Sequence, residues 1–108
     1  MQTFNKLVRD KIPEIIESNN ETCETRILQD EEYIIELNKK LLEEANEVVS
    51  ATNKEDTLEE LADLYEVILA KLDTLQSNID EIKEIAEAKT KKRGAFKKKI
   101  FLISTDKR

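Results

Sequence analysis

Two pairs of acidic residues are the part of this sequence best suited to chemistry. Glu44 and Glu47 form one pair, and Glu60 and Asp63 form the other. Each pair has the i, i+3 spacing that places two side chains side by side on one helix surface. Carboxylates gathered in one place repel one another and resist burial unless a positive charge lies between them. The residue types therefore indicate a site for a hard divalent cation.

The segment between the two pairs determines whether they can meet. Residues 48–59 are enough for the end of one helix, a tight turn and the start of an antiparallel helix. Asp30 is suited to cap a first long helix over about residues 31–52, and Asp56 or Thr57 a second over about 57–76. The acidic pairs flank two apolar stripes, formed by Ile34, Leu37, Leu41, Ala45 and Val48, and by Leu58, Leu61, Tyr65, Ile68, Leu72 and Leu75. A helical hairpin of this kind would bring all four carboxylates together.

The remaining segments complete an all-α prediction for a single domain, residues 1–108. One glycine and one proline favour long helices over a sheet with many turns. Asp10 is suited to cap a short N-terminal helix running to about Ser18, with Pro13 in its first turn. Its expected buried side is Ile12, Ile15 and Ile16.

A third long helix is expected near the C-terminus. Asn78 is suited to cap it, and Gly94 to end it after about residues 79–93. Its expected buried residues are Ile79, Ile82, Ile85 and Ala86. The segment that follows is predicted to be a basic, irregular tail whose Phe96, Ile100 and Leu102 dock on the helices.

The apolar arcs of the two long hairpin helices are broader than one short helix can cover. They extend to Ile35, Leu42 and Val49 on the first helix and to Leu64 and Leu69 on the second. We therefore predict a homo-oligomer, most simply a dimer in which two hairpins complete a four-helix bundle.

Composition excludes several classes of site. There is no histidine, which removes the usual zinc ligand and every Ser-His or Cys-His nucleophile pair. A metal must then be held by oxygen atoms, which suits magnesium or manganese. Cys23 is the sole cysteine, so there is no internal disulfide. No apolar run has the length of a membrane span or the form of a signal peptide, and we expect a cytoplasmic protein.

Charge is distributed unevenly behind the formal net value of −6. Residues 14–87 carry 22 acids and 6 bases, whereas the two ends carry 12 bases and 2 acids. An acidic middle with basic ends can hold a metal centrally and an anion around it. It disfavours nucleic-acid binding, because the middle would repel a phosphate backbone.

Four short segments, spread over most of the chain, occur in an order known from one superfamily. They are LEEANEV at 42–48, EELADLYEVI at 59–68, and the two ends NKLVRDKIP at 5–13 and KxxxRGxF at 89–96. The first two resemble the E-E-x-x-E and E-x-x-D helices of the all-α nucleotide pyrophosphohydrolases, which include MazG-like and phosphoribosyl-ATP pyrophosphohydrolase-like proteins. The two ends resemble a compact branch of the latter.

This resemblance implies magnesium-dependent hydrolysis of a nucleoside triphosphate, or a related nucleotide, to the monophosphate and pyrophosphate. Carried over by position, the metal ligands would be Glu44, Glu47, Glu60 and Asp63, and the phosphate contacts Lys6, Arg9, Lys89 and Arg93. It also implies a dimer or a pair of dimers, and a role in cleansing nucleotide pools.

Two other readings stay open. One is hydrolysis of phosphoribosyl-ATP in histidine synthesis, which the N-terminal and Arg-Gly segments favour less. The other is a non-catalytic helical module that uses its acidic surface to bind a basic partner, with the carboxylate pairs merely solvated. Metal-dependent release of pyrophosphate would separate an enzyme from such a module.

Overall fold

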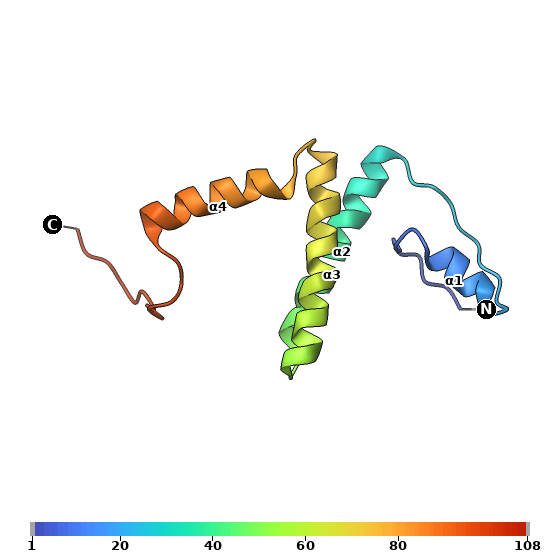
Figure 1. Ribbon diagram of the computed structural model, residues 1–108, viewed down its shortest axis with the longest axis horizontal. Helices are drawn as coiled ribbons and strands as arrows, with labels where there is room; N and C mark the ends of the chain where they lie inside the picture. Colours follow the sequence, from blue (N-terminus) through green and yellow to red (C-terminus); the bar gives the residue numbers. More distant parts are fainter. Residues whose placement is uncertain (1, 108) are drawn as a thin grey trace. The chain divides into compact units, whose positions relative to one another are not determined.

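The computed structural model describes residues 2–107, and within this range every regular element is an α-helix. The helices are α1 (Ile12–Ser18), α2 (Asp30–Ser50), α3 (Lys54–Thr74) and α4 (Ile79–Arg93), coloured in chain order in Figure 1. The predicted all-α class is confirmed. The chain divides into two compact units, one up to Gln76 with α1 to α3 and one from Ser77 onward with α4. Among the described residues no helix is both long enough and apolar enough to cross a membrane.

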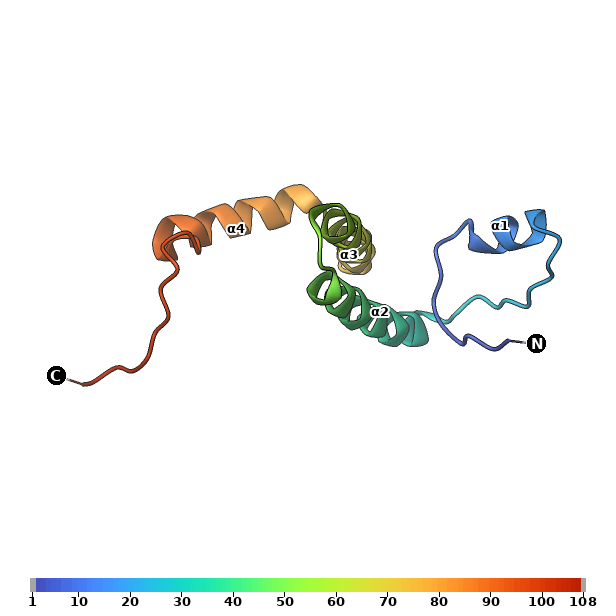
Figure 2. The same cartoon turned by 90° about the horizontal axis from the view of Figure 1, so that it is seen from below.

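α2 and α3 form the predicted helical hairpin and contain the buried core of the first unit. Only residues 51–53 connect them, and they lie side by side in both ribbon views (Figures 1 and 2). The buried apolar side chains are Leu37 on α2 and Val67 and Leu72 on α3. Lys71 also donates a hydrogen bond across the hairpin to Asn38 Oδ1, at 2.9 Å. Burying each aliphatic side chain contributes about 1.5–3 kcal/mol to folding stability. With three such side chains, the core is thin.

α3 begins three residues earlier than the predicted start at residue 57. Its N-cap is Asn53, whose side-chain oxygen accepts a hydrogen bond from the Asp56 backbone N–H at 2.8 Å. The Asn53 amide also donates to the Asp56 carboxylate at 2.9 Å. The prediction of Asp56 or Thr57 as the cap was wrong because Asn53 offers the same hydrogen bond earlier in the chain.

The starts of α1 and α2 also differ from the predicted caps. Asp30 is the first residue of α2 rather than its cap, and the helix ends at Ser50 rather than near residue 52. Its charge still suits the first turn, where the helix dipole is positive. α1 spans the predicted residues with Pro13 in its first turn, but Lys11 rather than Asp10 precedes it. α1 has no buried residue, and Ile15 is half exposed, so its predicted buried side is wrong within this chain.

α4 has the predicted bounds and both predicted end residues. Asn78 accepts a hydrogen bond from the Glu81 backbone N–H at 3.0 Å, and Ser77 donates one to the Glu81 carboxylate. Gly94 ends the helix with φ 81° and ψ 177°, a conformation that essentially only glycine adopts. The predicted burial along α4 is wrong within this unit, because α4 has no buried residue and Ile85 is 54% exposed.

Beyond Gly94 the described tail has no helix or strand, as predicted. Its apolar side chains are exposed, including the three that were expected to dock, Phe96, Ile100 and Leu102. Cys23 lies in the segment between α1 and α2, where it is exposed.

Candidate metal centre

Three carboxylates from the two hairpin helices meet at one place, and we call them the carboxylate triad: Glu44 of α2 with Glu60 and Asp63 of α3. One oxygen from each lies within 4.8 Å of the others. Glu44 is 9% exposed, the most buried charged residue in the described chain, whereas Glu60 and Asp63 are half-buried. The predicted meeting of the two acidic pairs is thus confirmed for three of the four carboxylates.

The register of the hairpin explains why Glu47 stays outside the triad. Glu44 and Glu60 each lie eight residues from Thr52, the middle of the connection, so they face each other across the hairpin. Asp63 follows Glu60 by one turn of α3 and lies on the same side of that helix. Glu47 lies one turn nearer the connection and is exposed. The prediction that the hairpin brings four carboxylates to one place is therefore confirmed for three of them, with Glu47 outside the group.

The surroundings of Glu60 make its ionised form costly. Its pKa is raised, first by partial burial and then by the negative charges of Glu47, Asp63, Glu44 and Glu59, in that order. Glu47 therefore remains close enough to act on the triad electrostatically. Without a bound cation this field favours protonation of Glu60.

Two basic side chains already contact the triad. Arg9 Nη2 lies 2.7 Å from Asp63 Oδ1, and Lys40 Nζ lies 3.7 Å from Glu44 Oε1. Lys40 is also 3.5 Å from Glu43 and is only 19% exposed. Lys40 was not predicted as part of the site, although its i, i+4 spacing to Glu44 indicates such a contact. The triad and Glu47 thus face two cations, of which Lys40 is shared with Glu43, so negative charge remains in excess at this place.

The four predicted phosphate contacts fall in different parts of the chain. Arg9 contacts Asp63, whereas Lys6 is exposed with its Nζ 5.7 Å from the centroid of the Phe4 ring. Lys89 and Arg93 belong to the second unit, where they line a shallow hollow on α4 with Lys92. Their role as phosphate contacts stays a prediction.

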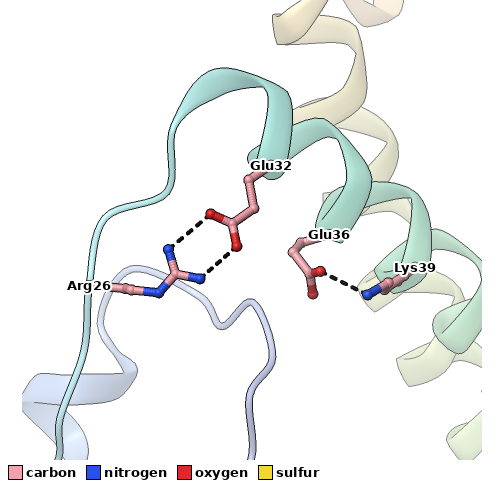
Figure 3. Close-up of polar contacts among 4 residues, drawn as sticks. All are labelled: Arg26, Glu32, Glu36 and Lys39. Atoms are coloured by element: carbon pink, nitrogen blue, oxygen red, sulfur yellow. Dashed lines mark hydrogen bonds and ion pairs between the residues drawn. The ribbon is translucent and has the colours of Figure 1, made fainter.

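A second group of charged residues, drawn in Figure 3, comprises Arg26 in the segment before α2 and three residues in the first half of α2, Glu32, Glu36 and Lys39. Arg26 donates two hydrogen bonds to the Glu32 carboxylate, at 2.9 and 2.6 Å, and Lys39 pairs with Glu36. The hydrogen bond from Arg26 lowers the pKa of Glu32, and the same bond raises the pKa of Arg26. These pairs neutralise their own acids, in contrast to the triad, which keeps an excess of negative charge.

The triad offers the oxygen donors that a hard divalent cation prefers. Magnesium binds carboxylate oxygens at about 2.0–2.1 Å, so oxygens on opposite sides of one ion are about 4.2 Å apart. The triad oxygens lie within 4.8 Å of one another. A small movement of the side chains would bring them to the separation of oxygens that bind one magnesium ion. All three donors are oxygen atoms, and the excess charge is negative. These residues therefore fit a hard divalent cation.

Comparisons with known proteins add one similar sequence. An uncharacterized protein of Mycolicibacterium smegmatis is 43% identical over 54 residues, which is 50% of this chain. The chain spans 55% of the length of that protein. No protein-family model matches the chain, and the search of solved structures gives no match. Membership of the pyrophosphohydrolase superfamily thus stays a prediction, and the geometry of the triad carries the functional argument.

Proposed function

We propose that this chain is a magnesium-dependent nucleotide pyrophosphohydrolase of the all-α superfamily that its sequence resembles. It would cleave a nucleoside triphosphate, or a related nucleotide, to the monophosphate and pyrophosphate. The observation that supports this best is the carboxylate triad, with its oxygens within 4.8 Å across the hairpin. The excess negative charge around the triad is the second support, because it calls for a cation that the chain itself does not supply.

The residues near the triad divide into two proposed roles. Glu44, Glu60 and Asp63 hold Mg²⁺, and Mn²⁺ suits the same oxygen donors. When bound, the ion would neutralise phosphate oxygens and lower the pKa of a water molecule. Glu47 lies outside the triad but beside Glu60, so its carboxylate is free to accept a proton from the attacking water. No protein nucleophile is required, in agreement with the absence of histidine.

Homo-oligomerisation belongs to the same proposal. Both hairpin helices expose large apolar side chains, among them Leu42 at 68% and Val49 at 84% on α2 and Leu58 at 55% on α3. A hairpin with three buried apolar side chains gains stability by covering such residues with a second hairpin. We propose a dimer, or a dimer of dimers, whose core is a four-helix bundle. A monomer in analytical ultracentrifugation at micromolar concentration would contradict it.

The decisive experiment substitutes one triad residue and one neighbour of equal charge. Glu60→Gln is expected to reduce pyrophosphate release at least about 100-fold. Substituting a residue that only hydrogen-bonds a metal ligand already lowers metal affinity or activity roughly 10- to 100-fold. Glu59→Gln is the matched control, because Glu59 is exposed and lies outside the triad. Pyrophosphate is measured with magnesium over a panel of canonical and modified triphosphates, with phosphoribosyl-ATP included. Full activity of Glu60→Gln would show that the metal assignment is wrong.

The division of roles has its own test in Glu47→Gln. If Glu47 accepts the proton, this variant retains the wild-type affinity for Mg²⁺ in calorimetry but loses turnover. If Glu47 is instead a ligand, the affinity for Mg²⁺ and the turnover fall together, as expected for Glu60→Gln. Circular dichroism is the control that checks whether both variants keep the helical fold.

The exposed tail favours a second candidate, a non-catalytic module that binds other proteins. Phe96, Phe101 and Ile103 are each at least 87% exposed, and lysines 97–99 lie among them. Exposed apolar side chains in this number are typical of interaction surfaces. A melting temperature that magnesium does not change, together with no pyrophosphate from any nucleotide, would favour this candidate over the enzyme.

A further inference from the structure

Arg9 is connected to the carboxylate triad over a long stretch of chain. Its pair with Asp63 spans 54 positions and joins the segment before α1 to the middle of α3. α1 itself has no buried residue, so little packing holds this segment in place. The contact needs an explanation, because Asp63 is also one of the three residues proposed to bind the metal.

We infer that Arg9 is a resident counter-ion of the triad, which the divalent cation displaces and which then binds the phosphates of the nucleotide. This inference rests on the proposed function and specifies how the site is loaded. In the metal-free chain the guanidinium supplies part of the positive charge that the carboxylates require. In the loaded site that task passes to the metal, and Arg9 becomes available to an anion.

The exposure of the two partners makes this exchange feasible. The Arg9 side chain is 58% exposed and the Asp63 side chain 45%. Ion pairs this exposed are weak, because water competes for both charges. Releasing Arg9 from Asp63 would therefore cost little free energy if a divalent cation bound the three carboxylates. A guanidinium does not lose its proton at any physiological pH, so Arg9 leaves Asp63 still charged.

The chemistry of arginine fits the second half of the exchange. Its planar guanidinium presents paired N–H donors that match the spacing of phosphate oxygens. Because Arg9 reaches Asp63, its released side chain would remain available to phosphates that approach the triad. Arg9 would then bind Asp63 in the metal-free chain and phosphate in the nucleotide-bound chain. Removing Arg9 should therefore strengthen Mg²⁺ binding and weaken phosphate binding.

The first part of the test measures Mg²⁺ affinity by calorimetry at about 0.15 M salt, where charges beyond about 8 Å are screened. Arg9→Gln is expected to bind Mg²⁺ about two- to fivefold tighter than wild type, the range that corresponds to losing one exposed ion pair. Lys11→Gln removes the same charge two residues away, from a side chain without an ion pair in the described structure. It should change the affinity less than about 1.5-fold.

The second part measures binding of inorganic pyrophosphate in saturating Mg²⁺, which requires no assumption about the base. Arg9→Gln is expected to bind it at least about tenfold more weakly, because a charge-assisted hydrogen bond is lost. Arg9→Lys should fall between the two, because lysine keeps the charge but not the paired donors. Lys11→Gln should remain within about twofold of wild type.

The outcomes separate this inference from the proposed function. If wild type binds Mg²⁺ and Arg9→Gln binds it equally or more weakly, Arg9 is not displaced and the inference is wrong. If Arg9→Gln tightens Mg²⁺ binding but leaves pyrophosphate binding unchanged, the transfer of Arg9 to phosphate is wrong. If neither wild type nor any variant binds Mg²⁺, the proposed metal centre itself is wrong and the inference fails with it.

Discussion

The hairpin and the C-terminal unit are both helical, but different interactions define them. α2 and α3 share buried side chains and a hydrogen bond between Lys71 and Asn38. α4 has a capping residue at each end, Asn78 and Gly94, and no buried residue between them. The comparison shows that local capping is enough to set the bounds of a helix, whereas gathering distant carboxylates requires packing between helices.

The sharpest way to test this contrast is to truncate matched apolar side chains. Leu72→Ala removes a side chain that is 5% exposed in the hairpin, and should lower the free energy of unfolding by about 2–5 kcal/mol. Ile85→Ala on α4 removes one that is 54% exposed, and should cost about 0.5 kcal/mol or less. Urea denaturation at one fixed protein concentration measures both. Leu75→Ala, from a leucine 65% exposed just after α3, is the matched control in the first unit.

Equal losses from Leu72→Ala and Ile85→Ala would contradict the contrast. They would mean that α4 is covered in solution as completely as the hairpin core.

Substituting the two capping asparagines makes the comparison finer. Asn53→Ala and Asn78→Ala each remove one side-chain acceptor, from Asp56 N and from Glu81 N, at a local cost of about 1 kcal/mol. In the hairpin this loss should appear in global unfolding, because α3 carries the core. In α4 it should appear as faster hydrogen exchange in the first turn, with global stability unchanged. A global loss from Asn78→Ala would show that α4 unfolds together with the hairpin.

The smallest expected effect concerns pH and the triad. The raised pKa of Glu60 means that its ionisation destabilises the folded chain, so its favourable contribution exists at low pH and is lost as pH rises through the folded pKa. Without divalent cations, Glu60→Gln should therefore melt higher than wild type at pH 7. The difference should disappear below the ordinary pKa of glutamate. Thermal melts with a chelator across this pH range measure it.

Adding magnesium should reverse that order, because the ion stabilises only a chain that binds it. Wild type should then melt above Glu60→Gln at pH 7. An unchanged order in magnesium would contradict the assignment of Glu60 as a ligand.

The parts of the fold that the sequence predicted correctly depend on local chemistry. α4 was predicted to the residue because Asn78 caps its first turn and Gly94, the sole glycine, ends it. The start of α3 was misplaced because three residues able to cap a helix lie within five positions, and Asn53 precedes the other two. The predicted burial of Ile15 and Ile85 failed because an apolar stripe shows which side could be buried but not whether anything covers it.

The candidate site divides in the same way. Helical periodicity and the length of the connection were enough to predict that Glu44, Glu60 and Asp63 meet. They were not enough to exclude Glu47, because a register difference of one turn depends on the residue at which the hairpin connection is centred. The pair between Arg9 and Asp63 was beyond the reach of local patterns, since it joins residues 54 positions apart.

Cys23 offers a single attachment point for a probe in the first unit. It is the sole cysteine, it is exposed, and it lies in the same unit as Arg9 and the hairpin. A spin label or fluorophore attached there modifies one defined position without any prior mutagenesis of other thiols. The native chain thus carries its own attachment point for following, in real time, whether the segment between α1 and α2 changes environment when magnesium is added.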